Sequence, residues 1–123
     1  MKMIFIIIGV VLLIYVSYRT YRFATLDNGL ANKIEKGAVI LDVRTEKEYL
    51  MGHIDGSINI SLGTIRERYT ELDKSKTYIT CCSHGLRSVK VEAILKEKGF
   101  NQVFNGGAWS DLEKIITEQK SKK

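Results

Sequence analysis

The sequence predicts an α/β domain with a parallel sheet flanked by helices on both faces, preceded by an N-terminal transmembrane helix. Two features of the 123-residue chain support this prediction. Residues 3–18 carry no charge and are almost wholly apolar. After them, short apolar runs typical of buried strands alternate with amphipathic segments typical of helices. Such alternation indicates parallel pairing, because each parallel connection needs a crossover segment.

The apolar segment 3–18 is interpreted as an uncleaved membrane anchor. A helix of this length covers about 24 Å, against about 30 Å for the hydrocarbon core. It can reach to Phe23, because Arg19 and Arg22 can extend their charges to the interface. A cleaved secretory signal is the alternative, but no small-residue cleavage site follows the apolar run. We therefore divide the chain into an anchor, residues 1–23, and a second domain, residues 24–123.

Basic residues predict the orientation of the anchor and the surroundings of the domain. Lys2 precedes the apolar run, whereas four basic residues follow it closely: Arg19, Arg22, Lys33 and Lys36. This excess predicts a single-pass protein whose second domain lies in the cytoplasm. The net charge is +5, but the basic residues are scattered and aromatic residues do not alternate with them. Proximity to anionic lipid explains this pattern better than nucleic-acid binding, so no nucleic-acid partner is expected.

Glycines mark the ends of the predicted elements, since the chain contains no proline. Residues 26–36 are predicted to form a short helix that ends at Gly37. Residues 38–43 form an apolar run with one acid near its end, as expected of a buried parallel strand. Thr45 and Glu48 form a capping box that opens a helix through about Met51, and Gly52 ends it.

The second half of the domain continues the alternation. A short strand is predicted at 57–60, a helix at 62–72, a third strand at 77–81 and the clearest helix at 88–98. A last strand at 101–104, a turn at Gly106 and Gly107, and a helix at 108–119 complete the domain. Ligands of parallel sheets bind at the carboxyl ends of strands. The residues after the third strand are therefore the candidate site.

Two adjacent cysteines, Cys81 and Cys82, end that third strand, and the chain has no others. Adjacent cysteines make a poor disulfide framework, which fits a reducing compartment. Two cysteines alone are also too few ligands for a structural zinc site. The sequence therefore predicts no metal.

The loop that begins at Cys82 is predicted to hold a negatively charged sulfur. A thiol is an effective nucleophile only as the thiolate. The amides of residues 83–88, the N-terminus of the following helix and the Arg87 guanidinium can all stabilise that charge. Such a cradle suits a thiolate, a persulfide or a bound oxyanion. We assign catalytic roles to Cys82 and Arg87. Substrate contacts are assigned to the rest of the loop: Ser83, His84, Gly85, Leu86 and Ser88.

The pattern Cys82-x-x-Gly85-x-Arg87-Ser88 resembles the active-site loop of the rhodanese family of sulfurtransferases. Segments 41–44, 48–49 and 52–60 resemble the first half of the same domain. Its end is matched by residues 98–100, Val103, Gly106, Gly107 and Trp109. The resemblance covers about residues 26–116. The chain departs from the family at two places. It has Asp55-Gly56-Ser57 where the family often has Pro-Gly-Ala, and Ser61 where the family often has proline. These differences affect the stiffness of the loops rather than the chemistry.

The resemblance implies sulfur transfer without a metal or organic cofactor. Cys82 would attack the outer sulfur of a donor such as thiosulfate and hold it as a persulfide. It would then pass the sulfur to cyanide or to a thiol, in a small molecule or a redox protein. Arg44 is included among the substrate-contacting candidates, although an ion pair with Asp42 that holds the fold is the favoured interpretation.

Two alternatives remain at this point. The first is a cysteine-dependent phosphatase with Cys81 as the nucleophile, since five residues separate Cys81 from Arg87, as in the loop of those enzymes. One branch of these phosphatases shares the rhodanese-like fold. Gly85 favours sulfur transfer, because it stands third after Cys82, where the sulfurtransferase loop has glycine. The second alternative is a non-catalytic module that carries or binds a persulfide. Cys81 itself is interpreted as a buried strand residue, with a resolving cysteine as the functional alternative.

Overall fold

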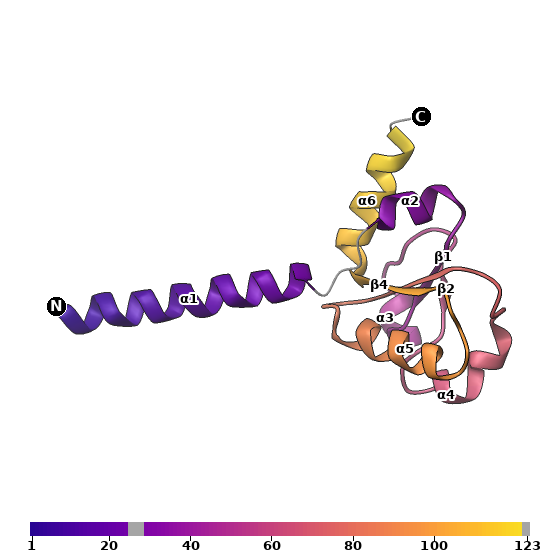
Figure 1. Ribbon diagram of the computed structural model, residues 1–123, viewed down its shortest axis with the longest axis horizontal. Helices are drawn as coiled ribbons and strands as arrows, with labels where there is room; N and C mark the ends of the chain where they lie inside the picture. The colour runs from indigo at the N-terminus through magenta and orange to yellow at the C-terminus, as the bar shows by residue number, and fades with distance from the viewer. Residues whose placement is uncertain (25–28, 122–123) are drawn as a thin grey trace.

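The computed structural model describes residues 1–24 and 29–121, in which strands and helices alternate after a long first helix (Figure 1). The helices are α1 (Lys2–Ala24), α2 (Leu30–Glu35), α3 (Glu46–Leu50), α4 (Ile65–Arg68), α5 (Leu86–Glu97) and α6 (Trp109–Ser121), with a 3₁₀ turn η1 (Tyr69–Glu71). The strands are β1 (Val39–Asp42), β2 (Ile58–Asn59), β3 (Tyr78–Cys82) and β4 (Val103–Ala108).

The strands form one parallel sheet in the order β2-β1-β3-β4. Asp42 at the end of β1 stands opposite Cys81 near the end of β3. Because all strands run the same way, their carboxyl ends share one edge of the sheet. The loop after Cys82 leaves from this edge, which we call the carboxyl edge.

Helices cover both faces of the sheet, as the sequence predicted. On one face, Leu41 and Val43 of β1 and the following loop pack with Val91 and Leu95 of α5. On the other face, Ile40 and Ile79 of the sheet pack with Leu30 of α2 and Leu112 of α6. Neighbouring strand residues point to opposite faces, so Cys81 belongs to the second cluster and Cys82 to the first. The two thiols are therefore separated by the sheet.

Several predicted boundaries differ from the structure, including those of three helices. The helix predicted at 62–72 is instead the short α4 followed by the 3₁₀ turn η1. The tighter turn aligns residues three apart, so Tyr69 and Leu72 both pack on the core. Helix α5 begins at Leu86, two residues earlier than predicted. Of the helix predicted at 26–36, residues 26–28 lie outside the described part of the chain, and α2 occupies Leu30–Glu35.

The prediction of a turn at Gly106 and Gly107 is wrong, because both glycines lie inside β4. The register between β3 and β4 shifts between Thr80 and Cys82, so β4 reaches Ala108 before α6 begins. A Cβ on Gly106 would lie 2.6 Å from Ile79 Cγ2 and 2.8 Å from the Thr80 carbonyl oxygen. This close approach, rather than a turn, requires glycine.

We therefore expect Gly106→Ala to destabilise the domain by about 1–3 kcal/mol, as overpacked cores do. Urea unfolding followed by circular dichroism measures the loss. Gly63→Ala is the matched control, since a Cβ there meets nothing within 4 Å. Equal stability of the two variants would contradict this account of Gly106.

Within residues 1–24 and 29–121, Lys2–Thr20 of α1 is the one segment that is long and apolar enough to cross a membrane. None of this segment is buried against the domain. A signal sequence has the same length and composition, so the anchor and its orientation remain a proposal.

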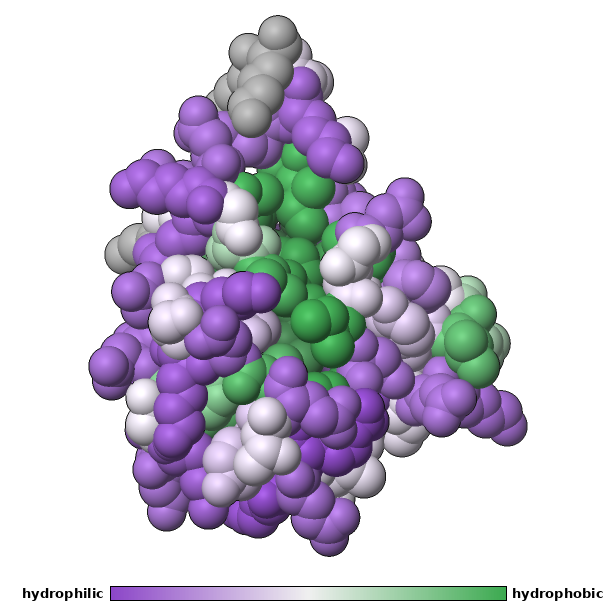
Figure 2. Space-filling model, turned by 90° about the vertical axis from the view of Figure 1, so that its right-hand side faces the viewer, coloured by the Kyte–Doolittle hydropathy of each residue, from purple (hydrophilic) through white to green (hydrophobic). Residues whose placement is uncertain are grey.

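The side of the domain that faces away from α1 is largely hydrophilic around an apolar stripe (Figure 2). A cavity of about 560 Å³ lies at the amino ends of the strands, where Val39 begins β1. Its lining includes Lys33, Lys36, Lys76 and Phe104. This cavity is at the edge opposite Cys82, so it is not the candidate active site.

Candidate active site

The sulfur of Cys82 lies between the end of β3 and the first turn of α5. The Gly85 N–H donates to Sγ at an N···S distance of 2.9 Å, and the Ser88 hydroxyl oxygen lies 3.6 Å from Sγ. Gly85 has a φ of +90°, and it places the N-terminus of α5 at the sulfur. That helix end carries a partial positive charge. The Cys82 thiol donates to the Ser88 hydroxyl oxygen, whereas the Gly85 N–H and the N-terminus of α5 point at Sγ. Of the loop amides predicted to surround the sulfur, that of Gly85 contacts it.

A buried network of hydrogen bonds joins the start of α5 to strands β3 and β4. Ser88 Oγ donates to Asn105 Oδ1 at 2.7 Å, and the same oxygen accepts the Gly107 N–H at 3.0 Å. Thr80 Oγ1 donates to the Ser88 carbonyl at 2.9 Å. Asn105 was not predicted as a site residue. It lies between the strand predicted at 101–104 and the turn predicted at Gly106, and its place inside β4 beside Ser88 depends on the register of that strand.

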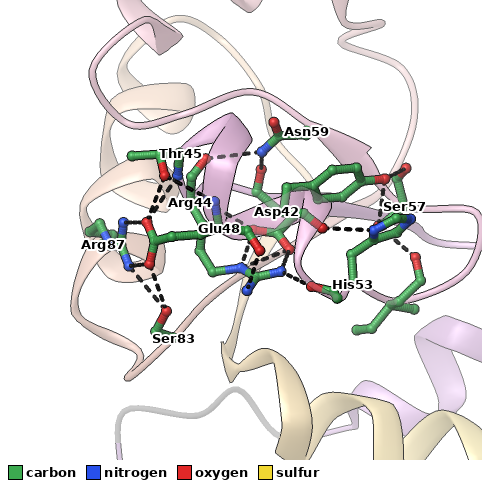
Figure 3. A network of polar contacts seen from close by, with 12 residues as sticks. Asp42, Arg44, Thr45, Glu48, His53, Ser57, Asn59, Ser83 and Arg87 are labelled. Carbon is green, nitrogen blue, oxygen red and sulfur yellow. Dashed lines mark hydrogen bonds and ion pairs between the residues drawn. The ribbon is translucent and has the colours of Figure 1, made fainter.

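The guanidinium of Arg87 is held by Glu48 of α3 (Figure 3). Its two terminal nitrogens contact the two carboxylate oxygens at 2.7 and 2.9 Å. Ser83 Oγ bridges both groups, at 3.1 Å from Glu48 Oε2 and 3.2 Å from Arg87 Nη2. The predicted capping box is confirmed: the Thr45 side chain accepts the Glu48 N–H, and the Glu48 side chain accepts the Thr45 N–H. Glu48 therefore ties α3 to the Cys82 loop, a role that the sequence analysis did not predict.

This pairing predicts a specific pH dependence of stability. Arg87 and the Thr45 amide hold the pKa of Glu48 well below its usual value of 4.5. A carboxylate with a lowered native pKa stabilises the fold above its unfolded pKa, and that contribution is lost as the pH falls through the native pKa. The effect is modest, because both side chains are about one-third exposed, at 32% and 36%.

We expect Glu48→Gln to be less stable than the original chain at neutral pH, with the difference shrinking as the pH falls below about 4.5. Urea unfolding of both chains at a series of pH values measures this difference in unfolding free energy. The other acidic residues are present in both chains, so their contributions cancel in the difference. A difference that stays constant from neutral to acidic pH would contradict the ion pair.

Arg44 lies in a buried network at the carboxyl edge of the sheet (Figure 3). Its Nη2 and Nε contact the Asp42 carboxylate at 2.7 to 3.1 Å, and Nη2 also donates to the Gly52 carbonyl at 2.7 Å. The guanidinium stacks over the Trp109 ring at 4.8 Å. Arg44 is 4% exposed and Asp42 fully buried. This geometry supports the interpretation that Arg44 stabilises the fold through its ion pair with Asp42, rather than contacting substrate.

The remaining predicted residues differ in exposure. His84 and Leu86 are exposed on the loop, whereas Ser88 is buried beneath it. His53 contacts the Tyr49 carbonyl at 2.9 Å and stacks on the Tyr49 ring at 3.8 Å. These contacts are those of a structural histidine.

Cys81 is fully buried on the opposite face of the sheet from Cys82. Burial and the nearby Asp42 carboxylate raise the pKa of its thiol. The thiol form is therefore favoured, and Cys81 is poorly suited to attack a substrate. Over the described residues, His, Cys, Asp and Glu side chains form no group of three or more that could hold a metal ion.

Residues 27–110 match the sequence profile of the Rhodanese-like domain, which is more than half of the chain. The chain belongs to the rhodanese-like domain family. The match includes β1 to β4 and the whole Cys82 loop.

Proteins similar to this rhodanese-like chain include two curated enzymes. Thiosulfate sulfurtransferase PspE of Escherichia coli is 35% identical over 74 residues, which are 58% of this chain and 71% of that protein. The tRNA sulfurtransferase of Thermoplasma acidophilum is 36% identical over 95 residues, or 77% of this chain. Those residues span only 19% of the longer archaeal protein.

The rhodanese-like fold is also found by comparison of structures. The crystal structure of a rhodanese-related protein from Thermoplasma volcanium superposes with a TM-score of 0.60 and 36% sequence identity. The superposition covers 69% of this chain and 85% of the other.

Proposed function

We propose that the chain is a membrane-anchored sulfurtransferase that moves sulfane sulfur through a persulfide on Cys82. Relatives named as sulfurtransferases support a rhodanese-type role in sulfur transfer. The observation that carries the assignment to Cys82 is the contact of 2.9 Å between the Gly85 N–H and Sγ, at the N-terminus of α5. The Gly85 N–H can therefore stabilise negative charge on this sulfur, both when sulfur is taken from the donor and when it is passed to the acceptor.

Thiosulfate is the proposed donor, in line with the name of the E. coli relative. The Cys82 thiolate attacks the outer sulfur of thiosulfate, the S–S bond of the donor breaks, and sulfite leaves with the electron pair. The products are a Cys82 persulfide anion and sulfite, so the total charge is conserved. A thiolate or cyanide then attacks the outer sulfur, and Cys82 leaves as the thiolate. Neither step needs an oxidant, a metal or an organic cofactor.

Arg87 is proposed to act mainly by positioning. Both of its terminal nitrogens are engaged by Glu48, so the pair joins α3 to the first turn of α5. Fixing this turn keeps the Gly85 N–H directed at Sγ. A lysine could supply the charge but not the two parallel hydrogen bonds.

The phosphatase alternative is disfavoured by the position of Cys81. That thiol is buried across the sheet from the loop, with a raised pKa. The persulfide-carrier alternative is favoured by one observation, because Cys82 is only 1% exposed. A donor or acceptor must displace loop atoms to reach the sulfur, and a buried persulfide would exchange slowly.

Localisation is part of the same proposal. The length and composition of α1 support a single span, and the basic residues after it support a domain in the cytoplasm.

Thiosulfate-dependent formation of thiocyanate from cyanide tests the function, with the full chain held in detergent. We expect steady turnover together with negligible hydrolysis of aryl phosphates. A stable persulfide without turnover would support the carrier instead. Aryl-phosphate hydrolysis that depends on Cys81 would support the phosphatase.

A further inference from the structure

We propose that the cavity at the amino ends of the strands binds an organic phosphate, either the headgroup of an anionic phospholipid or a soluble phosphate ester. This cavity lies where Val39 begins β1, at the edge of the sheet opposite Cys82. It is therefore a second site, and its occupation is independent of the proposed transfer of sulfur.

Three lysines from separate segments line this cavity. Lys33 belongs to α2, Lys36 caps the C-terminus of that helix, and Lys76 precedes β3 by two residues. Among the described residues, those that line the cavity include no aspartate and no glutamate. A cleft lined by charges of one sign concentrates ions of the opposite sign. The occupant expected here is therefore an anion.

The acidic side chains closest to these lysines in the sequence have other partners. Glu35 accepts a hydrogen bond from a glutamine of α6 at 3.2 Å. Asp73 accepts the N–H and the hydroxyl of Ser75 at 2.9 and 2.6 Å. Within residues 1–24 and 29–121, neither Lys36 nor Lys76 forms an ion pair with a carboxylate. Both ammonium groups are therefore available to an anion that enters the cavity.

The other walls of the cavity indicate that the anion carries an organic part. The Lys33 ammonium lies over the Phe104 ring at 4.2 Å, beside the apolar side chain of Val39. Thr77 Oγ1 donates to Gln102 Oε1 at 2.6 Å, which leaves the Gln102 amide nitrogen as a donor. Lysines and an amide donor suit phosphate oxygens. The apolar wall suits a glycerol or other carbon group attached to the phosphate.

The size of the cavity and its place in the chain fit both sources of such a phosphate. Its volume of about 560 Å³ lies within the range of about 300–1,000 Å³ that is usual for small-molecule sites. Ala24 ends α1 and Leu30 begins α2, the helix that lines the cavity. Six residue steps span at most about 21 Å. With α1 in a bilayer, phospholipid headgroups are therefore close to the cavity, whereas a soluble ester reaches it without an anchor.

The test uses the full chain, labelled with ¹⁵N, in micelles of a maltoside detergent, which carries no phosphate. Dioctanoyl phosphatidic acid and glycerol 3-phosphate are added in separate titrations, and the amide signals of Gly37, Val39 and Thr77 are followed by NMR. We expect saturable shifts of these signals, because the three residues line the cavity. Shifts with both ligands support a site for the phosphate ester itself. Shifts with phosphatidic acid alone support a lipid headgroup site.

Two double variants with the same change in net charge separate the cavity from general attraction. Lys36→Gln with Lys76→Gln removes charges from the cavity, whereas Lys90→Gln with Lys114→Gln removes exposed charges from α5 and α6. We expect at least about tenfold weaker binding for the first pair and less than about a twofold change for the second, because salt screens distant exposed charges. Equal weakening by both pairs, or no saturable shift with either ligand, would overturn the proposal. Thiocyanate formation is measured separately, so this failure would leave the proposed function standing.

Discussion

Replacing Cys82 with alanine is expected to lower the rate of sulfur transfer by at least about a thousandfold, because the nucleophile itself is lost. The thiol lies at the end of β3 with the Gly85 N–H directed at its sulfur. None of the other loop side chains can take up sulfane sulfur. Thiosulfate-dependent thiocyanate formation measures the loss.

Cys81→Ala is the matched control for this variant. Cys81 is fully buried on the far face of the sheet, where it packs as a small apolar residue. We expect most of the transfer rate to remain. The account is wrong if Cys81→Ala abolishes transfer while Cys82→Ala retains it, because the nucleophile would then be on the other side of the sheet.

Arg44→Ala is expected to cost about 3–5 kcal/mol of stability, because it leaves the Asp42 carboxylate buried without its partner. Asp42 is fully buried and accepts three hydrogen bonds from the Arg44 side chain. The substitution also removes the donor to the Gly52 carbonyl and the stacking on Trp109. Urea unfolding of the full chain in detergent, followed by Trp109 fluorescence and circular dichroism, measures the change.

Arg68→Ala provides the comparison, since Arg68 pairs with Glu71 at 2.8 Å on the surface. Both partners are about half exposed, and such a surface pair contributes little to stability. A double variant, Asp42→Asn with Arg44→Met, should recover part of the loss by removing both charges together. Similar losses of stability for Arg44→Ala and Arg68→Ala would show that the buried pair does not stabilise the carboxyl edge.

The sequence was sufficient to predict the parallel sheet, the helices on both faces and the position of Cys82 at a strand end. Each of these features depends on local patterns: the apolar run at 38–43, the capping box of Thr45 and Glu48, and the glycine at 85. In the structure β3 extends to Cys82, so Cys81 and Cys82 face opposite sides of the sheet. The strand predicted at 77–81 stopped one residue short of showing this.

Contacts between distant segments could not be predicted in the same way. Glu48 binds Arg87 across 39 positions, and Ser88 binds Asn105 across 17. Both pairs depend on how β1, β3 and β4 are aligned, and the register shift after Thr80 moves the glycines of β4 from a turn into the sheet. Local composition carries no information about that shift. The sequence therefore predicted that Arg87 stabilises the charge on the Cys82 sulfur, whereas in the structure its terminal nitrogens bind the Glu48 carboxylate.

The site of the persulfide tests the central claim most directly. The full chain is incubated with thiosulfate, alkylated, digested and analysed by tandem mass spectrometry, which assigns any added sulfur to one of the two adjacent cysteines. The account predicts one extra sulfur atom on Cys82 and none on Cys81. Added sulfur on Cys81, or none on either residue while thiocyanate still forms, would contradict it.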